Sequence, residues 1–351
     1  MTMLAEQVDV VIGVDTHKHT HTAAAIASST GAALAHTTVT ADAAGYAELI
    51  AFADQHASSR GWAIEGAGGY GAGLTRHLTD CQEIVLEIDR PKRPKRRAGA
   101  KTDLIDAERA AREALARDHL AQPKTGAVRA ALQMRLAARR AAVTASADAQ
   151  KQLLALVVTA PQRLRDRFAG QRTPAVIATA AKLRATTTGD VEYDTAVAVL
   201  RALARRIQDL QTEAATHQTA ICALVRSWRP DLLDQPGIGP IVAATVLTAW
   251  SHAGRCRNDG AFAMLAGAAP IPASSGMTVR YRLNRAGDRH LNQALHTITL
   301  TRLKHDPATR AYAERRRKEG KSDRDIRRCL KRYICRDLYR RLEHQSPLDA
   351  S

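Results

Sequence analysis

Four acidic side chains stand where a folded chain could bring them together. Asp15 follows the apolar run Val8–Val14, and Glu65 ends the short run "GWAIE", so both are expected at strand ends. Asp103 and Asp106 are three residues apart in a helical stretch and therefore share one helix face. Carboxylates this close repel each other, and a divalent cation offsets that repulsion. The pattern predicts a site for one or two Mg²⁺ ions, which would activate a nucleophile and stabilise the leaving oxygen of a phosphodiester.

Each acid also has an ordinary structural explanation. Asp15 suits a turn, Asp103 suits the first turn of a helix because of the helix dipole, and Asp106 suits a solvated surface. Taken singly, these explanations are the better ones. The joint placement at two strand ends and one helix face favours the metal site.

Three histidines follow the first acid at alternate positions: His17, His19 and His21. Alternate residues on an extended segment face the same way, so they could form a metal site of their own. The chain has no second ligand motif to accompany them. We therefore expect a polar hairpin turn whose histidines are bystanders to the carboxylates, with at most one of them near a phosphate.

A second candidate for chemistry is the serine pair Ser274 and Ser275 in the loop 270–276. Basic residues follow it, namely Arg280, Arg282, Arg285, Arg289 and His290. A serine beside a glycine and several arginines could attack a phosphodiester, with the arginines binding its non-bridging oxygens. A Ser/Gly surface loop beside a DNA-binding face has the same composition, and the residues alone leave both interpretations open.

Two glycines, Gly237 and Gly239, precede an apolar helix in "PGIGPIVAATVLTAW". Glycines allow a tight turn that presents backbone N–H groups at a helix start. This pattern is typical of a helix-hairpin-helix element, which grips a phosphate backbone without reading bases. An ordinary turn between two helices is the alternative.

The overall charge indicates a polyanionic partner. The 351 residues include 52 Lys and Arg against 35 Asp and Glu, a formal net charge of +17. Nucleic acid is the default partner for such a chain, and a generally sticky basic protein is the alternative. The densest basic segment is "RPKRPKRRAGAK", residues 90–101, which we expect to be an extended loop. Its candidate nucleic-acid-binding residues are Lys92, Arg93, Lys95, Arg96, Arg97 and Lys101.

Other classes of protein fit less well. The five cysteines form no CxxC pair and are odd in number, which argues against a disulfide framework and a zinc site. The first ten residues do not read as a signal peptide, and no apolar run is long enough to span a bilayer. We therefore expect a cytoplasmic protein with no membrane partner.

The elements that must position the acids read as strand, strand, strand, helix, strand, helix, strand, helix. The strands are expected at 8–14, 22–28, 32–40, 61–65 and 83–88, and the helices at 43–57, 73–78 and after Thr102. Asp42 and Thr102 are the expected helix N-caps. This order is expected of an RNase H-like domain, although other α/β folds share it.

The middle of the chain is rich in Ala, Leu and Arg. Apolar residues at three- and four-residue spacing predict two long helices, at 128–158 and 193–228, separated by the segment 161–190. They could form an antiparallel coiled-coil arm that serves as a spacer and dimerisation element, or a plain helical bundle inside one large domain. A third unit begins at Pro230.

In combination these motifs resemble the IS110-type transposases, also described as RNA-guided bridge recombinases. The stretches that carry the resemblance are "GVDTHK", "AIEGAGGYG", "KTDLIDA", "PGIGPIVAATVL" and "LAGAAPIPASSG". The resemblance implies a RuvC-like (RNase H-like) catalytic domain at 1–122, a helical coiled-coil or dimerisation arm at 123–229 and a mainly helical transposase domain at 230–343. Residues 344–351 would be a disordered tail. "GAAP" and "NRAGDRH" depart from the usual family pattern.

The resemblance also implies a mechanism. Asp15, Glu65, Asp103 and Asp106 would be the acidic quartet that binds Mg²⁺, and the serine directly before the glycine, Ser275, would be the nucleophile, with Ser274 as its neighbouring alternative. The serine would form a covalent link to DNA, which a freed 3′-hydroxyl of the other duplex would resolve.

The implied partners are donor and target DNA duplexes, a structured guide RNA and further copies of the chain, as a dimer or tetramer. The acids of one protomer would face the serine of another, and the protein would work at the bacterial nucleoid. Two other functions remain open: a junction-resolvase type of metal-dependent nuclease that uses water, and a non-catalytic nucleic-acid-binding protein.

Overall fold

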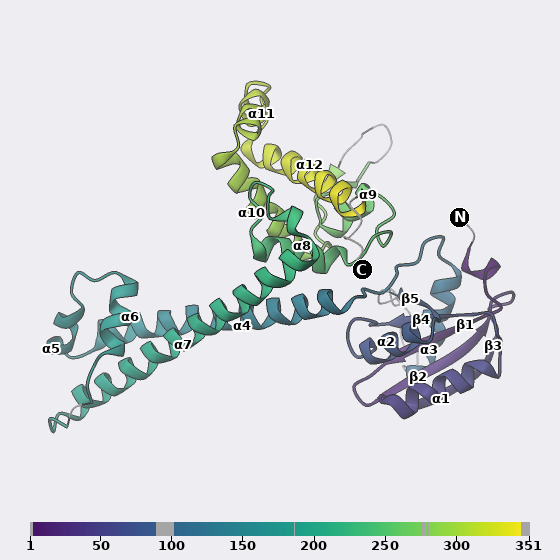
Figure 1. Cartoon of the computed structure of the whole chain (residues 1–351), viewed down its shortest axis with the longest axis horizontal. Helices are drawn as coiled ribbons and strands as arrows, with labels where there is room; N and C mark the ends of the chain where they lie inside the picture. Colours follow the sequence, from purple (N-terminus) through teal and green to yellow (C-terminus); the bar gives the residue numbers. More distant parts are fainter. Residues whose placement is uncertain (1–2, 89–101, 186, 275–277, 279–280, 345–351) are drawn as a thin grey trace. The chain divides into compact units, whose positions relative to one another are not determined.

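A computed structural model describes residues 3–88, 102–185, 187–274, 278 and 281–344 (Figure 1). The chain divides into two units, Met1–Lys124 and Thr125–Ser351, each with its own core. These units do not by themselves define functional domains, so the domain limits given above remain predictions. Within the described part of the chain, every helix is too short or too polar to cross a membrane.

Unit 1 is built on one mixed five-stranded sheet. Its elements are η1 (Leu4–Glu6), β1 (Val10–Thr16), β2 (Thr20–Ala27), β3 (Ala33–Thr40), α1 (Ala43–Asp54), β4 (Arg60–Glu65), α2 (Ala72–Asp80), β5 (Ile84–Ile88) and α3 (Asp103–Leu115). The strand order is β3-β2-β1-β4-β5. β1, β2 and β3 pair antiparallel, whereas β1, β4 and β5 pair parallel. This mixed sheet fits an RNase H-like domain.

The expected elements of unit 1 are all present, and most limits agree within two residues. Asp42 caps α1 by accepting a hydrogen bond from the Gly45 amide at 3.0 Å, and Thr102 caps α3 by accepting one from the Ile105 amide at 3.3 Å. These contacts confirm the two predicted N-caps. The first strand runs on to Thr16, so Asp15 lies inside the pairing with β2 instead of beyond it.

The two faces of the sheet bury different partners. Val10, Ile12 and Val14 of β1 belong to the core cluster formed with α1 and α2. Val11 of β1 and Ala63 of β4 belong to the cluster formed with α3. Because side chains alternate along a strand, odd-numbered positions of β1 and β4 face α3.

The approach of α3 to the sheet is very close at Gly13. A Cβ at this position would lie 2.0 Å from the Ala107 carbonyl oxygen and 2.8 Å from the Ala111 amide nitrogen. The buried face of α3 consists of alanines, Ala107, Ala110, Ala111 and Ala114. Small residues on both sides therefore let the helix backbone sit directly on the strand.

Gly13→Ala should destabilise unit 1 strongly. The added methyl would press on helix backbone, which cannot move aside as a side chain can, so we expect a loss of about 3 kcal/mol or more, the upper end of overpacking effects. Urea unfolding followed by circular dichroism measures it. Gly68→Ala is the matched control, because a Cβ there meets open space. A Gly13→Ala protein as stable as this control would contradict the close packing.

His21 on β2 is fully buried and stacks on Tyr46 of α1 with ring centroids 5.8 Å apart. Burial lowers the pKa of His21 below its ordinary value, and the nearby His17 lowers that pKa further. In the unfolded chain the pKa of a histidine returns to about 6.5. The unfolded state therefore binds more protons below that pH, and the folded state loses stability as the pH falls.

We expect the free energy of unfolding of the wild type to drop between pH 7.5 and pH 5 more steeply than that of His21→Phe. Phenylalanine keeps a ring against Tyr46 but does not titrate. Urea unfolding at a series of pH values measures the difference between the two proteins, which removes the contribution of all other groups. Parallel pH profiles would show that protonation of His21 is not opposed by the fold.

Unit 2 is helical apart from one short hairpin. Its elements are α4 (Ala127–Thr159), α5 (Gln162–Arg165), η2 (Asp166–Phe168), α6 (Thr173–Ala181), α7 (Val191–Trp228), η3 (Pro230–Leu232), α8 (Pro240–Trp250), α9 (Asp259–Leu265), β6 (Ile271–Pro272), β7 (Tyr281–Arg282), α10 (Arg289–His305), α11 (Pro307–Lys318) and α12 (Asp323–His344). The two predicted long helices are α4 and α7. The separating segment, expected only as a break, forms α5, η2 and α6 and packs in one cluster with both long helices.

Helices α4 and α7 pack side by side in opposite directions (Figure 1). Arg135 near the start of α4 bonds His217 near the end of α7, and Leu153 further along α4 shares a cluster with Leu200. Leu132 and Val225 also belong to the core formed by α8, α9, α10 and α12. The long helices are thus continuous with the C-terminal core, while a supercoil and a role in dimerisation stay predictions.

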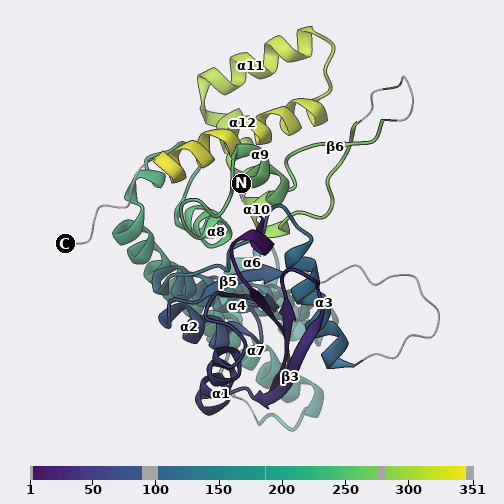
Figure 2. The same ribbon diagram turned by 90° about the vertical axis from the view of Figure 1, so that its right-hand side faces the viewer.

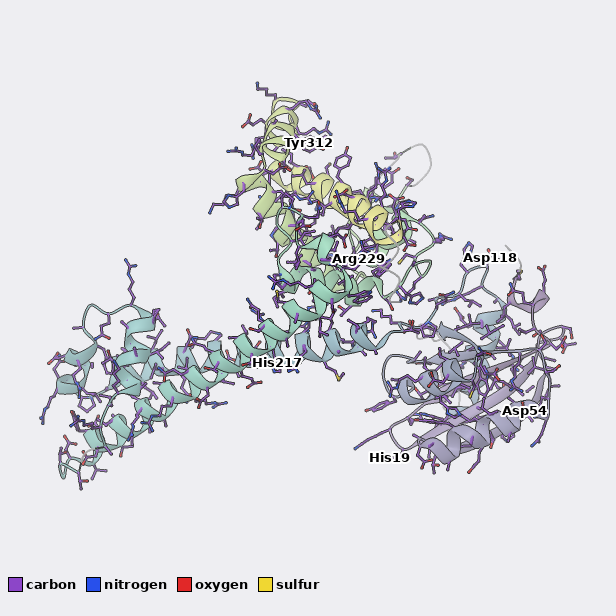
Figure 3. The ribbon with its side chains drawn as sticks, in the orientation of Figure 1. His19, Asp54, Asp118, His217, Arg229 and Tyr312 are labelled. Atoms are coloured by element: carbon purple, nitrogen blue, oxygen red, sulfur yellow. The ribbon has the colours of Figure 1, made fainter. Side chains whose placement is uncertain are left out.

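The end of α7 is fixed by Arg229, which is buried (Figure 3). Its guanidinium forms a two-point ion pair with Asp231, both N···O distances being 2.7 Å. It also donates to the carbonyl oxygens of Arg341 and Leu342 at the end of α12. A planar guanidinium can bridge several acceptors at once, so this residue ties the turn after α7 to the last helix.

Candidate active site

The end of β1 and the start of α3 bring Asp15, His17 and Asp103 together. His17 Nε2 lies 3.1 Å from Asp15 Oδ2 and 3.4 Å from Asp103 Oδ1. One candidate ligand atom from each residue falls within 4.8 Å of the other two. The close packing of α3 on Gly13 places the first turn of this helix beside Asp15.

Asp106 lies on the same side of α3. Asp103 precedes Ala107 by four residues and Asp106 precedes Ala110 by four, so both acids continue the buried alanine face by one turn. Asp106 Oδ1 accepts a hydrogen bond from Arg109 Nη1 at 3.0 Å. The side chains of Asp15 and Asp106 are 13% and 20% exposed, whereas that of Asp103 is 52% exposed, so the site opens to solvent on the Asp103 side.

Glu65 reaches the same face of the sheet by strand register. Val14 pairs with Ile64 in the parallel β1–β4 ladder, so Asp15 and Glu65 are the next positions of the two strands. Both are odd-numbered positions and face α3. Thr16 Oγ1 donates a hydrogen bond to the Glu65 carbonyl oxygen at 2.8 Å, which ties the two strand ends together.

The electrostatics of this site suit a cation. Burial raises the pKa of Asp15 above its ordinary value, His17 lowers that pKa, and the charges of Asp103 and Asp106 raise it. The surroundings therefore destabilise the ionised carboxylate relative to the same group in water. Carboxylate oxygens are the preferred ligands of hard divalent cations, and a cation here would relieve both the burial and the repulsion. The residues present fit a divalent metal.

His17 lies closer to the acids than a bystander in the hairpin was expected to lie, and its role in the chemistry stays a prediction. The β1–β2 turn carries it back over Asp15, two residues earlier, where the His17 amide donates to the Thr20 carbonyl oxygen at 3.0 Å. The alternation of Asp15 and His17 was the signal in the sequence. His19 is exposed, and His21 is buried on β2.

In unit 2, the two glycines have different roles. Gly237 has a φ of +82°, and a Cβ there would lie 3.2 Å from the Ile298 carbonyl oxygen, so both the turn and its packing on α10 require glycine. Gly239 is the N-cap of α8 and is open on its Cβ side. The helix-hairpin-helix assignment and its contact with a phosphate backbone stay predictions.

Three of the predicted nucleic-acid-binding arginines, Arg282, Arg285 and Arg289, are exposed and line one cavity of ≈ 910 Å³. Sequence reasoning missed the cations that α12 adds to this cavity, among them Arg327 and Lys331. Arg327 and Lys331 are four residues apart in the sequence, and this spacing predicts that they share one face of a helix. Ser274 is exposed after β6.

Several predicted residues lie outside the described part of the chain. They are Ser275, Arg280 and the six basic candidates Lys92, Arg93, Lys95, Arg96, Arg97 and Lys101, together with the tail from 345 onward. Their assignments stay predictions.

Two family models match this chain, one towards its N-terminus and one in its C-terminal part. Residues 12–160 match a DEDD-type IS110 family model described as "Transposase", and this range contains all four acids. Residues 230–314 match the model described as "Transposase IS116/IS110/IS902 family", which contains the glycine turn and Ser275.

The chain belongs to the IS110 family.

A curated relative, the "Insertion element IS900 uncharacterized 42 kDa protein" of Mycobacterium paratuberculosis, is 32% identical over 130 residues. The aligned part is 36% of this chain and 33% of that protein, so the chain spans about a third of the length of the relative it matches. The last helix of this IS110 family chain, α12, lies beyond both matched ranges.

Metal binding should be visible as stabilisation. Mg²⁺ at ten times its dissociation constant should raise the free energy of unfolding of the wild type by about 1.4 kcal/mol, because only the folded chain gathers the acids. Asp15→Asn should be more stable than the wild type without metal, since it removes a disfavoured charge, and should gain nothing from Mg²⁺. Thermal unfolding with Mg²⁺ and with EDTA measures both effects. Glu48→Gln, on the exposed face of α1, is the control. Equal stabilisation of Asp15→Asn and wild type by Mg²⁺ would rule out a metal at Asp15.

Proposed function

We propose that this chain is the transposase of an insertion sequence, which cuts and exchanges DNA strands through a serine-linked intermediate assisted by Mg²⁺-binding carboxylates. The convergence of Asp15, Asp103 and Asp106 at one end of the sheet carries the proposal. Membership of the IS110 family supports it, because one matched range holds the acids and the other holds the serine.

The serine supplies the nucleophile. Ser275 Oγ attacks a DNA phosphorus, the Oγ–P bond forms, the P–O3′ bond breaks, the hydroxyl proton is lost and the 3′-oxygen leaves as a hydroxyl. The 3′-hydroxyl of the other duplex then attacks the phosphoserine, which breaks the P–Oγ bond and regenerates the serine. The strands are exchanged without loss of phosphodiester bonds.

The arginines of the hairpin region bind the phosphate in both steps. Arg282, Arg285 and Arg289 are exposed around one cavity and would hold the non-bridging oxygens, with Arg280 in the same role. Mg²⁺ held by Asp15, Glu65, Asp103 and Asp106, as one or two ions, would stabilise the developing negative charge.

His17 has two roles open to it in this site. Its Nε2 lies between the two carboxylates, where a cation would sit. The imidazole therefore either joins the ligands or rotates away when a metal binds. In the metal-free protein a charged imidazole would partly neutralise Asp15 and Asp103.

The partners follow from the family and from the surface. The net charge of +17 suits donor and target DNA together with a structured guide RNA that selects both by base pairing. The acids and the serine belong to different units, so a homodimer or tetramer could combine them between protomers. The arm offers an apolar surface for such contact, a hollow of ≈ 530 Å³ lined in part by Leu156, Val191 and Val199. Such a protein would act in the bacterial cytoplasm at the nucleoid.

A water-using nuclease is the second candidate, and His17 is the observation in its favour. An imidazole 3.1 Å from Asp15 is placed as a general base of a hydrolytic site. This reaction would need the acids but not the serine.

A covalent adduct separates the two reactions. With donor and target DNA, guide RNA and Mg²⁺, the wild type should give a protein–DNA band on denaturing gels. Ser275→Ala should lose at least about 1,000-fold in adduct formation, as expected when a nucleophile is removed. Asp106→Asn should lose it as well, because phosphate activation needs the metal.

The matched controls are Ser274→Ala, which removes the neighbouring hydroxyl, and Glu108→Gln, which changes an acid on α3 that pairs with Arg112. Both should keep the adduct. Cleaved ends without any adduct, unaffected by Ser275→Ala, would replace the recombinase by the nuclease. Loss of the adduct in Ser274→Ala alone would move the nucleophile by one residue.

A further inference from the structure

Basic side chains line a cavity between α10 and α12, next to the β6–β7 hairpin. Its volume is ≈ 910 Å³, and none of its described lining residues is acidic. Figure 2 shows β6 beside α9 below α12. A cavity of this size admits one nucleotide, whereas a duplex is too wide to enter it.

The cations that α12 contributes to the cavity fall into two groups. Arg328 pairs with Asp325 at 3.2 Å, and Arg332 and Arg336 share the single carboxylate of Asp259 at 2.7 and 3.3 Å, so the charge of this group is partly offset. Arg324, Arg327 and Lys331 have no acidic partner among the described residues. These three follow each other at roughly one-turn spacing and form a row on α12. The row is free to receive an anion.

Lys331 is held in place by a hydrogen bond from its ammonium group. Its Nζ is half-buried and donates to Asn292 Oδ1 at 2.8 Å. Asn292 is fixed in turn, because its Nδ2 donates to the Ala266 carbonyl oxygen at 2.7 Å. An amide is uncharged, so this contact does not offset the charge of the lysine and leaves two further N–H donors.

The described charged side chains that line the cavity are all basic. Burial lowers the pKa of Lys331. Burial also lowers the pKa of His296, another lining residue, and the charges of Lys331 and Arg327 lower it further. The chain thus places positive groups side by side without a matching acid, an arrangement that an incoming phosphate would stabilise.

Two tyrosines complete the lining. Tyr281 is 64% exposed and Tyr333 is 52% exposed, which is unusual for large rings. Tyr333 is held in place by Tyr312, whose ring packs edge-on at 5.7 Å, and by Arg336 at 5.9 Å from its centroid (Tyr312 is labelled in Figure 3). An exposed, fixed ring beside a row of cations is the arrangement that binds single-stranded nucleic acid, with bases stacked on the ring and phosphates on the cations.

We propose that this cavity binds one strand of nucleic acid, with a backbone phosphate at Lys331 and Arg327 and an unstacked base against Tyr333. The proposal extends the site beyond the hairpin arginines to α12, a helix outside both matched family ranges. It rests on the proposed function only in taking nucleic acid as the ligand, and it needs neither the serine nor the metal. The strand is a DNA end or a guide RNA segment, which share this chemistry.

The test is strand binding by the full chain in EDTA, where cleavage is impossible. Fluorescence anisotropy with fluorescein-labelled dT12, U12 and a 12-base-pair duplex, over a series of salt concentrations, gives affinity and salt dependence. Lys331→Gln should bind the single strands roughly 3–10-fold more weakly and lower the slope of log K against log salt by about 0.7, the value for one phosphate contact. Lys331→Arg should keep the wild-type affinity and the wild-type salt slope, since arginine carries the same positive charge.

Tyr333→Ala should weaken single-strand binding roughly 5–100-fold, the range for one stacked base, and leave the salt slope unchanged. Lys318→Gln at the exposed end of α11 and Tyr70→Ala in unit 1 are the matched controls, and both should bind as the wild type does. Thermal unfolding of each variant shows that the fold is retained.

The probes identify the source of the strand. Tighter binding of dT12 than of U12 would indicate a DNA strand, and tighter binding of U12 would indicate an RNA strand. If the two variants weaken the binding of both probes to a similar extent, the site recognises the chemistry that DNA and RNA share. The proposal is overturned if Lys331→Gln and Tyr333→Ala match their controls, or if they alter only duplex binding. The binding assay measures no cleavage, so a protein that fails to recombine DNA can still show strand binding at this cavity. Failure of the proposed function and failure of this site are therefore distinguishable.

Discussion

The packing of α3 on Gly13 is the contact on which the candidate active site depends. The helix can lie on β1 only because Gly13 has no side chain and because the buried face of α3 is alanine. With its axis fixed there, the first turn of the helix projects past the last residues of the strand. The packing of the helix backbone, which is rigid, then holds Asp103 and Asp106 beside Asp15.

This construction places repelling charges at the end of a well-packed sheet. Asp15 is partly buried and faces two other carboxylates, which disfavours its ionised form. The apolar clusters on both faces of the sheet supply the stability that offsets this local cost. A site that is strained without a cation binds one more tightly, because the cation removes the strain. Without a cation, His17 lies beside Asp15 and Asp103 and lowers the pKa of Asp15, which partly offsets the repulsion between the carboxylates.

Unit 2 presents the opposite charge. Two of its acids pair with arginines of the fold: Asp259 is shared by Arg332 and Arg336, and Asp231 pairs with the buried Arg229. Other cations of α12 and of the hairpin are left without acidic partners in the described residues. The chain thus carries a group of acids that fits a cation on one unit and a cavity lined by basic side chains on the other. A reaction on a phosphodiester needs both, and the proposed mechanism brings them together through the DNA and the assembly.

Much of this protein is determined by local sequence. The period-2 strands, the Asp42 and Thr102 caps and the two long helices follow from periodicity and hydrogen-bonding groups that act within a few residues. The quartet Asp15, Glu65, Asp103 and Asp106 could be named because strand ends and one helix face are local features. The family resemblance added Ser275, which composition alone did not distinguish from a surface serine.

Only the tertiary structure decided what depends on distant contacts. The position of His17 over Asp15 follows from a turn geometry that three alternating histidines do not specify. The cavity between α10 and α12 joins residues more than 30 positions apart, such as Asn292 and Lys331, whose hydrogen bond no local pattern predicts. The helices of the segment 161–190 were missed because they are short and form against α4 and α7. Long-range packing selects these arrangements, since local propensity is too weak to do so.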